Sequence, residues 1–205
     1  LSPEDINRFD RFAIFNRSGA ANKASDIGLY ACIALPLTLG LAEKTRNDFL
    51  TLGILYAEVF LLNTGIKGIT KKLVSRARPY VYNTTLPVEE RQDTESRKSF
   101  FSGHTSTAFS SAVFFASVFQ DYFPRSRWRA AVWAGSLLLA SFVGYMRIEA
   151  GKHYPTDVLA GALAGGLTGY LVPLCHRPKN RNMSVAPVIL PRQAGIAFIW
   201  KIPKK

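Results

Sequence analysis

Five apolar segments separate the charged residues of this chain, and they constrain its fold more than any other feature. They are Ile27–Ala42, Phe49–Ile66, Ala108–Phe119, Ala130–Met146 and Val158–Cys175. The last two contain 17 and 18 residues without a charge, which is the lower limit of what spans a bilayer. We interpret all five as helices. They predict an all-α protein, a helical bundle of about five core helices embedded in a membrane.

Small and polar residues within these segments bear on the choice between membrane and water. The second segment contains Glu58 and Asn63, which weakens its membrane signal. Gly161, Gly165 and Gly169 recur every four residues and therefore lie on one face of the last helix. Such a stripe lets helices approach closely in a membrane, whereas each glycine costs about 1 kcal/mol in a helix in water. The stripe favours the membrane, and tight packing in a soluble bundle is the alternative.

The two ends of the chain differ from its centre. Residues 1–26 mix polar and aromatic residues and predict an N-terminal amphipathic segment at the membrane interface. Residues 27–176 form the predicted helical core, and residues 177–205 form a basic C-terminal tail. The β-prone runs Ser184–Leu190 and Gly195–Ile202 predict a short β-hairpin in this tail. Because an isolated hairpin cannot sit in lipid, we expect it at the aqueous edge.

The net charge of +12 is concentrated in the tail, which holds seven basic and no acidic residues. The rest of the chain has 19 basic and 14 acidic residues, so the charge does not indicate a nucleic-acid partner. Cys32 and Cys175 lie in apolar runs without metal-ligand spacing and are expected to be small buried side chains. The sequence predicts no metal and no cofactor, and no pattern in it sets an oligomeric state.

Three separated stretches hold polar and ionisable residues at fixed spacings. They are Lys71 with Arg78-Pro79, then Ser102-Gly103-His104, then Arg147 with His153 and Asp157. Taken singly, each has an ordinary interpretation as a solvated charge, a helix cap or a structural hydrogen bond. Together they supply three cations, two imidazoles and one carboxylate, which is more than core packing requires. This combination is suited to binding and transferring phosphate.

Local conformation supports this interpretation. Proline disfavours the helical region at the residue before it, so Arg78 is expected at a helix end, where its fork can meet an anion. Ser102 is a good N-cap, and free backbone N–H groups at a helix start attract phosphate oxygens. Pro155 suits the first turn of a second helix. Asp157 follows His153 by four residues, close enough to bond one ring nitrogen and leave the other free.

The residues suggest a mechanism, which we state as a hypothesis. Neutral His153, oriented by Asp157, attacks phosphorus in line and forms a phosphohistidine. Protonated His104 gives a proton to the leaving oxygen and then helps to activate water. Positive side chains and backbone N–H groups hold the phosphate, so no metal is required. The predicted phosphate-binding residues are Lys71, Arg78, Ser102, Gly103 and Arg147.

In order and spacing, these residues resemble the signature of the type 2 phosphatidic acid phosphatase superfamily, whose active sites are similar to those of vanadium haloperoxidases. The resemblance covers about half of the chain, from Lys71 to Asp157. Phe101 replaces a proline of the family pattern, and Met146 replaces a serine. The resemblance implies a phosphatase that hydrolyses a phosphomonoester or pyrophosphate, with a phosphorylated lipid as its substrate and the membrane as its surroundings. A soluble acid phosphatase, a vanadium haloperoxidase and an inactive lipid-binding protein are the alternatives.

The order of the segments also predicts a topology. If consecutive helices run antiparallel, the three stretches share one side of the membrane, and Arg125, Arg127 and Arg129 lie on the other. Basic residues favour the cytoplasmic side, so we expect an integral protein of a bacterial-type cell membrane with an extracytoplasmic active site. The polar segment Tyr80–Ser99 is longer than a simple connector and is a candidate lid or recognition loop.

Overall fold

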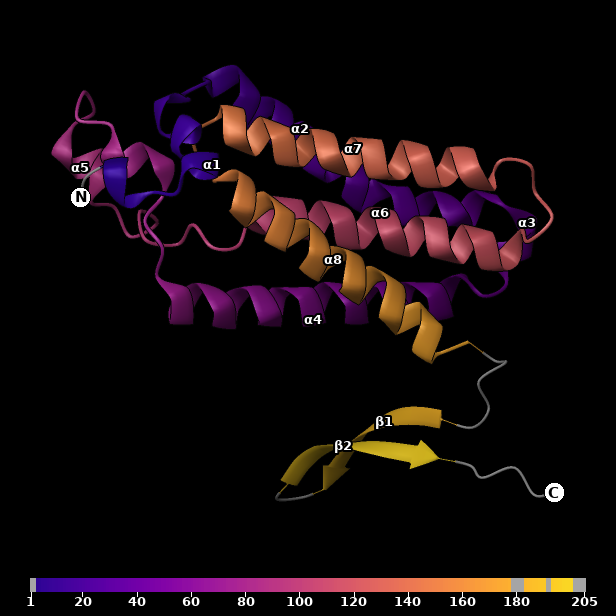
Figure 1. Cartoon of the computed structure of the whole chain (residues 1–205). Coiled ribbons are helices and arrows are strands. Elements are labelled where there is room, and N and C mark those ends of the chain that lie inside the picture. Colours follow the sequence, from indigo (N-terminus) through magenta and orange to yellow (C-terminus); the bar gives the residue numbers. More distant parts are fainter. Residues whose placement is uncertain (1–2, 178–182, 191–192, 201–205) are drawn as a thin grey trace.

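The computed structural model describes residues 3–177 and the backbone of residues 183–190 and 193–200. Within these residues, five helices of at least 16 residues form the body of the protein. Figure 1 shows them side by side, with α6 in the middle. They are α2 (Gly19–Ala34), α4 (Phe49–Val74), α6 (Gly103–Tyr122), α7 (Arg129–Glu149) and α8 (Pro155–Cys175). This arrangement confirms the predicted helical bundle.

Short helical turns flank and connect the long helices. They are η1 (Pro3–Asp5), α1 (Arg8–Arg11), η2 (Phe12–Phe15), η3 (Leu35–Leu41), α3 (Glu43–Arg46), η4 (Pro79–Tyr82) and α5 (Val88–Arg91). The turns that precede α2 lie at the same end of the bundle as α5 (Figure 1).

Four helical segments are long and apolar enough to cross a membrane. They are Gly19–Leu41, Phe49–Tyr82, Arg129–Glu149 and Pro155–Cys175. Only 17% to 33% of the residues in their most apolar windows are buried inside the protein, so most of their side chains face outward. On α4, for example, Leu61 is 71% exposed and Leu73 is 80% exposed. Because exposed apolar surface on this scale suits lipid rather than water, the bundle is membrane-embedded, as predicted.

The central helix α6 has a different composition because the other helices surround it. Twelve of its 20 residues are buried, and half of these are serine or threonine. Their hydroxyl groups bond within the protein: Ser110 and Ser111 both donate to the carbonyl of Thr107, at 3.0 and 2.9 Å. Tyr56 of α4 shares a 2.7 Å hydrogen bond with Ser111. The weak apolar signal of this segment therefore reflects enclosure by protein.

The predicted glycine stripe is the contact between α8 and α6. A Cβ at Gly165 would lie 2.0 Å from the carbonyl oxygen of Ser106, and one at Gly169 would lie 2.3 Å from that of Ser110. No side chain fits at such distances, so the backbone of α8 lies directly on the backbone of α6. This contact fixes where α8 begins relative to α6.

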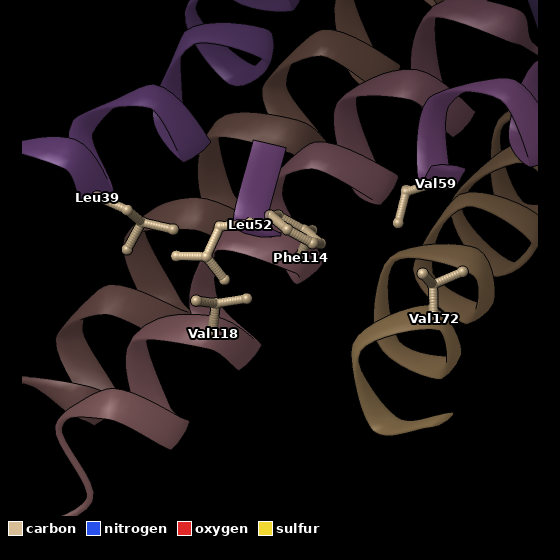
Figure 2. Packing of buried hydrophobic residues seen from close by; sticks show 6 residues of the cluster. All are labelled: Leu39, Leu52, Val59, Phe114, Val118 and Val172. Carbon is tan, nitrogen blue, oxygen red and sulfur yellow. The ribbon is translucent and has the colours of Figure 1, made fainter. Parts of the chain in front are cut away.

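An apolar cluster holds the other half of α6. Figure 2 shows its six buried side chains, which come from η3, α4, α6 and α8. They are Leu39, Leu52, Val59, Phe114, Val118 and Val172. The ring of Tyr56 packs against Phe114 with 5.1 Å between centroids. The cluster secures α4 and α8 against the C-terminal half of α6, away from the predicted phosphate site.

Several helix boundaries differ from the prediction, and the first predicted segment is divided, because α2 ends at Ala34 and the 3₁₀ helix η3 follows it. The first long helix begins at Gly19 rather than at Ile27, with Ser18 as its N-cap accepting the N–H of Ala21 at 3.1 Å. Its first two turns are rich in polar residues and therefore lack the apolar pattern of a membrane helix. Similarly, α4 continues past Ile66 to Val74. The predicted amphipathic segment is helical from Pro3 to Phe15 apart from two residues, and its place at the interface stays a prediction.

Two strands follow the helical body. The backbone of β1 (Met183–Leu190) pairs antiparallel with that of β2 (Gln193–Trp200), with Met183 opposite Trp200. Residues 191 and 192, between the two strands, and the side chains of both strands lie outside the described residues. The docking of this tail at the aqueous edge stays a prediction.

The glycine contact gives a first testable prediction. Gly165→Ala places a methyl group against the Ser106 carbonyl, so α8 must move away from α6, and we expect a loss of about 1–3 kcal/mol in unfolding free energy. The matched control is Gly166→Ala, because the nearest atom to a Cβ there is 4.0 Å away. Thermal unfolding in detergent, followed by circular dichroism, compares the two. Equal stability of both variants would contradict the packing described here.

Candidate active site

The three predicted stretches lie together at the end of the bundle that carries α1 and α5 (Figure 1). The start of α6 meets the start of α8, because the N–H of Ser102 donates to the carbonyl of Asp157 at 3.0 Å. The end of α4 reaches the same place, since a Cβ at Gly103 would lie 3.8 Å from Nζ of Lys71. Helix ends that are far apart in sequence therefore form one site.

His153 is fully buried beside the start of α8. Its Nδ1 lies 2.8 Å from the carbonyl oxygen of Ser99. A carbonyl can only accept, so Nδ1 carries the proton and Nε2 carries the free lone pair. Burial lowers the pKa of His153 to about 3. The charges of Arg78 and Arg147 also lower this pKa, whereas Asp157 raises it. The imidazole is therefore neutral near pH 7.

Asp157 does not make the predicted hydrogen bond to His153. Its Oδ2 lies 3.7 Å from Nδ1, which is too long for such a bond, although the two groups face each other. Ser99 stands between them, because its carbonyl accepts from His153 and its hydroxyl donates to Asp157. The N–H of Tyr154 and the guanidinium of Arg76 also bond to the carboxylate, at 3.0 and 2.6 Å. The spacing of four residues brings the pair together but not into direct contact.

Arg78 lies just after α4, before the proline that begins η4. Its backbone N–H donates to Ser96 at 2.8 Å, and its guanidinium contacts Glu95 at 3.1 Å. The N–H of Ser99 donates to the carbonyl of Arg76 at 3.0 Å. These bonds close the predicted loop Tyr80–Ser99 at its base. The buried Nε of Arg78 has no hydrogen-bond partner among the described residues.

Arg147 and His104 are held by α2, which the sequence did not link to the site. Asn22 accepts from Nη1 of Arg147 at 2.8 Å, and Ser25 accepts from the same atom at 3.2 Å. Nε2 of His104 lies 2.9 Å from Asp26, whose carboxylate is 4.0 Å from Arg147. Within the described part of the chain, Nε of Arg147 is also buried without a partner.

The environment of His104 sets its protonation. Burial lowers the pKa of His104 to about 4, and the charges of Arg147 and Lys71 act in the same direction, whereas Asp26 opposes them. His104 is therefore neutral near pH 7 in the unliganded protein. A bound anion would offset the two cations and raise this pKa.

The start of α6 has the expected cap. Ser102 is buried, and its hydroxyl oxygen accepts from the hydroxyl of Thr105 at 2.9 Å and from the N–H of Thr105 at 3.4 Å. A Cβ at Gly103 would lie 2.9 Å from the side chain of Lys67, which crosses this position. Glycine therefore lets a lysine of α4 lie against the helix start, where N–H groups favour anions.

A cavity of about 420 Å³ opens beside these residues. Its walls include Asn22, which bonds to Arg147, and Lys152, which precedes His153. Tyr80, from the loop between the first two motifs, forms another wall. None of the eight predicted site residues is among the described residues that line the cavity, so Asn22 and Lys152 are its links to them. The cavity is large enough for a polar headgroup.

Taken together, the structure brings the eight predicted residues to one end of the bundle. Positive side chains and a helix start surround a neutral imidazole with a free Nε2, an arrangement that binds a tetrahedral oxyanion and can attack it. The supporting residues that the sequence did not reveal are Asp10, Asn22, Ser25, Asp26, Arg76, Glu95 and Ser99. The polar spacing of Asn22, Ser25 and Asp26 on one helix face was a signal for part of this set.

Comparison with known proteins agrees with this geometry. The sequence profile of the PAP2 superfamily matches residues 52–181. The chain is 40% identical over 81 residues to lipid A 1-phosphatase of Porphyromonas gingivalis, covering 40% of this chain and 17% of that protein. It is 27% identical to lipid A 4'-phosphatase of Bacteroides thetaiotaomicron, covering 79% of this chain and 61% of that protein. It is also 27% identical to a probable diacylglycerol pyrophosphate phosphatase 1 of Schizosaccharomyces pombe, covering 69% of this chain and 60% of that protein. The chain spans less than two thirds of the length of each of these relatives.

Two solved structures share the fold. One is a transmembrane PAP2-type phosphatidylglycerolphosphate phosphatase from Bacillus subtilis, with a TM-score of 0.56, 25% identity and 80% of both chains covered. The other is LpxE of Aquifex aeolicus, with a TM-score of 0.57, 23% identity and coverage of 85% of this chain and 99% of that one.

The pairing of Asp26 with His104 gives a second prediction. Asp26→Asn removes the charge that opposes Arg147 and Lys71, so the pKa of His104 should fall below the wild-type value of about 4. With three histidines in the chain, the ring signals can be assigned and titrated by NMR. Asp121→Asn, at the opposite end of α6, is the control. A midpoint for His104 that stays constant or rises in Asp26→Asn would refute the assigned contact.

Proposed function

This chain belongs to the PAP2 superfamily, and we propose that it is a membrane phosphatase that hydrolyses a phosphomonoester or pyrophosphate of a lipid through a phosphohistidine at His153. One observation carries the proposal most directly. Arg78 and Arg147 each bury an Nε without a hydrogen-bond partner in the described chain, and both act electrostatically on His153. A buried N–H group requires a hydrogen-bond acceptor, and the oxygens of a phosphoryl group next to the imidazole would supply one to each Nε.

In the first step, the lone pair on Nε2 of His153 attacks phosphorus. The new N–P bond forms as the P–O bond to the leaving group breaks, and His104 gives its proton to the leaving oxygen. The Nδ1–H of His153 keeps its hydrogen bond to Ser99, and Asp157 stabilises the positive charge that develops on the ring. In the second step, His104 takes a proton from water, which attacks phosphorus and breaks the N–P bond.

The cations bind the three equatorial oxygens of the phosphoryl group. Lys71, Arg78 and Arg147 supply the charge, and the N–H groups at Ser102 and Gly103 assist. The present acidic partners of the site, Glu95 and Asp26, have side chains 51% and 42% exposed. Exposed ion pairs contribute little, so a phosphate bound deeper in the site can displace them. This cradle requires no metal ion.

A lipid substrate follows from the position of the site. The reacting residues lie at the ends of helices whose outer surfaces face lipid, and the cavity beside them can take a headgroup. The relatives named as lipid A phosphatases and a diacylglycerol pyrophosphate phosphatase support a lipid over the soluble substrate of an acid phosphatase. We propose the loop Tyr80–Ser99, which contributes Tyr80 to the cavity, as the element that recognises the headgroup.

We propose that the site faces the extracytoplasmic side of a bacterial-type cell membrane. Arg125 and Arg127 lie between α6 and α7, and Arg129 begins α7, at the end opposite the site. Basic residues near membrane helices favour the cytoplasmic side. The site end also carries several cations. In this proposal they bind phosphate, so they do not indicate the cytoplasmic side.

The nucleophile is tested by His153→Asn. Phosphate release from reconstituted vesicles containing phosphatidic acid or diacylglycerol pyrophosphate should fall at least roughly 1,000-fold, because the attacking nitrogen is lost. Labelled substrate and rapid quenching should trap an acid-labile phosphoenzyme in the wild type and none in the variant. The control is His176→Asn at the end of α8. Near-normal activity of His153→Asn would exclude this nucleophile, and turnover of soluble phosphates alone would favour the acid phosphatase.

Topology is tested by labelling single cysteines on intact cells. The background variant is Cys175→Ser, because the other native thiol of this chain, Cys32, is buried. In this background, Glu89→Cys reports on the site end and Asn47→Cys on the opposite end. A maleimide that cannot cross membranes should label Cys introduced at position 89 and not at position 47. The reverse pattern would place the active site in the cytoplasm.

A further inference from the structure

Asp10 is a fully buried carboxylate in a very short helix, and its contacts lead to the proposed active site. It accepts hydrogen bonds from Nη2 of Arg76 at 2.8 Å and from Nδ2 of Asn7 at 2.8 Å. It also accepts from the N–H and the hydroxyl of Thr156, at 3.0 and 2.6 Å. Burial raises the pKa of Asp10, and the bonds from Thr156 and Arg76 more than offset this, so the carboxylate stays ionised. Thr156 is adjacent to Asp157.

Arg76 joins Asp10 to Asp157. Its Nη2 contacts Asp10 at 2.8 Å, and its Nη1 contacts Asp157 at 2.6 Å. Its guanidinium lies over the ring of Tyr154, 4.1 Å from the centroid, which fixes the plane of the fork. One cation therefore holds two carboxylates whose side chains are both inaccessible to solvent. The planar fork has donors in a fixed geometry that matches both carboxylates, whereas a lysine ammonium is a point charge without that geometry.

Arg76 also reaches His153 through the backbone. Its carbonyl accepts the N–H of Ser99 at 3.0 Å, and the carbonyl of Ser99 accepts from Nδ1 of His153. The hydroxyl of Ser99 bonds to Asp157, which Arg76 holds from the other side. The two groups that orient the imidazole are therefore both attached to one arginine.

These contacts differ from those of an ion pair that only stabilises the fold. Arg76 is two residues before Arg78 and does not line the cavity. Asp10 lies outside residues 52–181, the part of the chain that the family profile matches. Its buried charge is nevertheless connected to Asp157 by a single side chain. The segment before α2 thus contributes to the geometry of the reacting pair.

Resting on the function proposed above, we infer that Arg76 and Asp10 are positioning residues: Asp10 holds Arg76, which aligns Asp157 and, through Ser99, sets the direction of His153. The segment before α2 is accordingly part of the active site. Neither residue contacts the substrate, so both should affect the rate of phosphoryl transfer and not substrate binding.

Kinetics of full-length protein in phosphatidic acid vesicles test this inference. Arg76→Gln and Asp10→Asn should lower kcat roughly 10- to 100-fold, as is typical of groups that orient a reacting side chain, with little change in KM. Arg76→Lys should recover only part of the loss. The matched control is Arg177→Gln at the other end of α6, because Arg177 is as exposed as Arg76 (29% against 25%) and also forms a 2.8 Å ion pair, with the more exposed Asp121. Unchanged kcat in the first two variants, or a loss confined to KM, would overturn the inference.

A double-mutant cycle separates positioning from general stability. In an Asp157→Asn background, Arg76→Gln should cause little further loss of kcat, because the group it positions is already gone. A purely structural arginine would give the same fold loss in both backgrounds. If Arg76→Gln does not fold, Arg76→Ala assayed with added guanidinium replaces it, and failure of guanidinium to restore kcat would count against the inference.

A measurement without turnover keeps the two proposals distinguishable. The Nδ1 proton of His153 should give a downfield NMR signal, which Arg76→Gln shifts and Arg177→Gln does not. An inactive wild type that shows this shift would refute the proposed function and leave the positioning contact intact. An active wild type whose signal and kcat are both insensitive to Arg76 would refute the positioning role.

Discussion

The backbone contact between α6 and α8 determines where the rest of the site can lie. Because the glycines at 165 and 169 let α8 rest on the carbonyl groups of α6, the first residues of both helices come together, and Ser102 bonds to the carbonyl of Asp157. A side chain at either glycine would separate the helices and the two motifs that begin them. The apolar cluster at the other end holds α4 against this pair, running in the opposite direction, so that its C-terminal end brings Lys71 to the same point. Packing of small residues in a membrane thus produces a polar site at the helix ends.

The protonation of the two histidines in the site depends on their burial among positively charged side chains. Burial, with the charges of Arg78 and Arg147, keeps His153 neutral, which preserves the lone pair that the proposed reaction needs. Burial, with the charges of Arg147 and Lys71, also lowers the pKa of His104 in the unliganded protein, so the proposed acid becomes protonated only when phosphate offsets these charges. Substrate binding and proton donation are linked through one set of charges. Asp157 opposes these cations at His153, and Arg76 and Ser99 hold its carboxylate in place.

The five helices, and the eight residues that meet at one end of the bundle, could be predicted from the sequence, because apolar runs and fixed motif spacings are local patterns. The supporting contacts could not, since they join segments that lie far apart. Asp10 meets Arg76 across 66 positions, and Asp26 meets His104 across 78. The polar start of α2 lacked the apolar pattern of a membrane helix, although it supplies three of the side chains that hold Arg147 and His104. The distance between His153 and Asp157 depends on Ser99, which no spacing between the two residues encodes.

A structure of the protein with bound orthovanadate would test the central claim most directly. Vanadate adopts the trigonal bipyramidal geometry of phosphoryl transfer. We predict an axial bond from Nε2 of His153, equatorial oxygens in contact with Lys71, Arg78 and Arg147, and His104 beside the opposite axial oxygen. Vanadate bound elsewhere, or bound at this end of the bundle without contact to His153, would contradict the account.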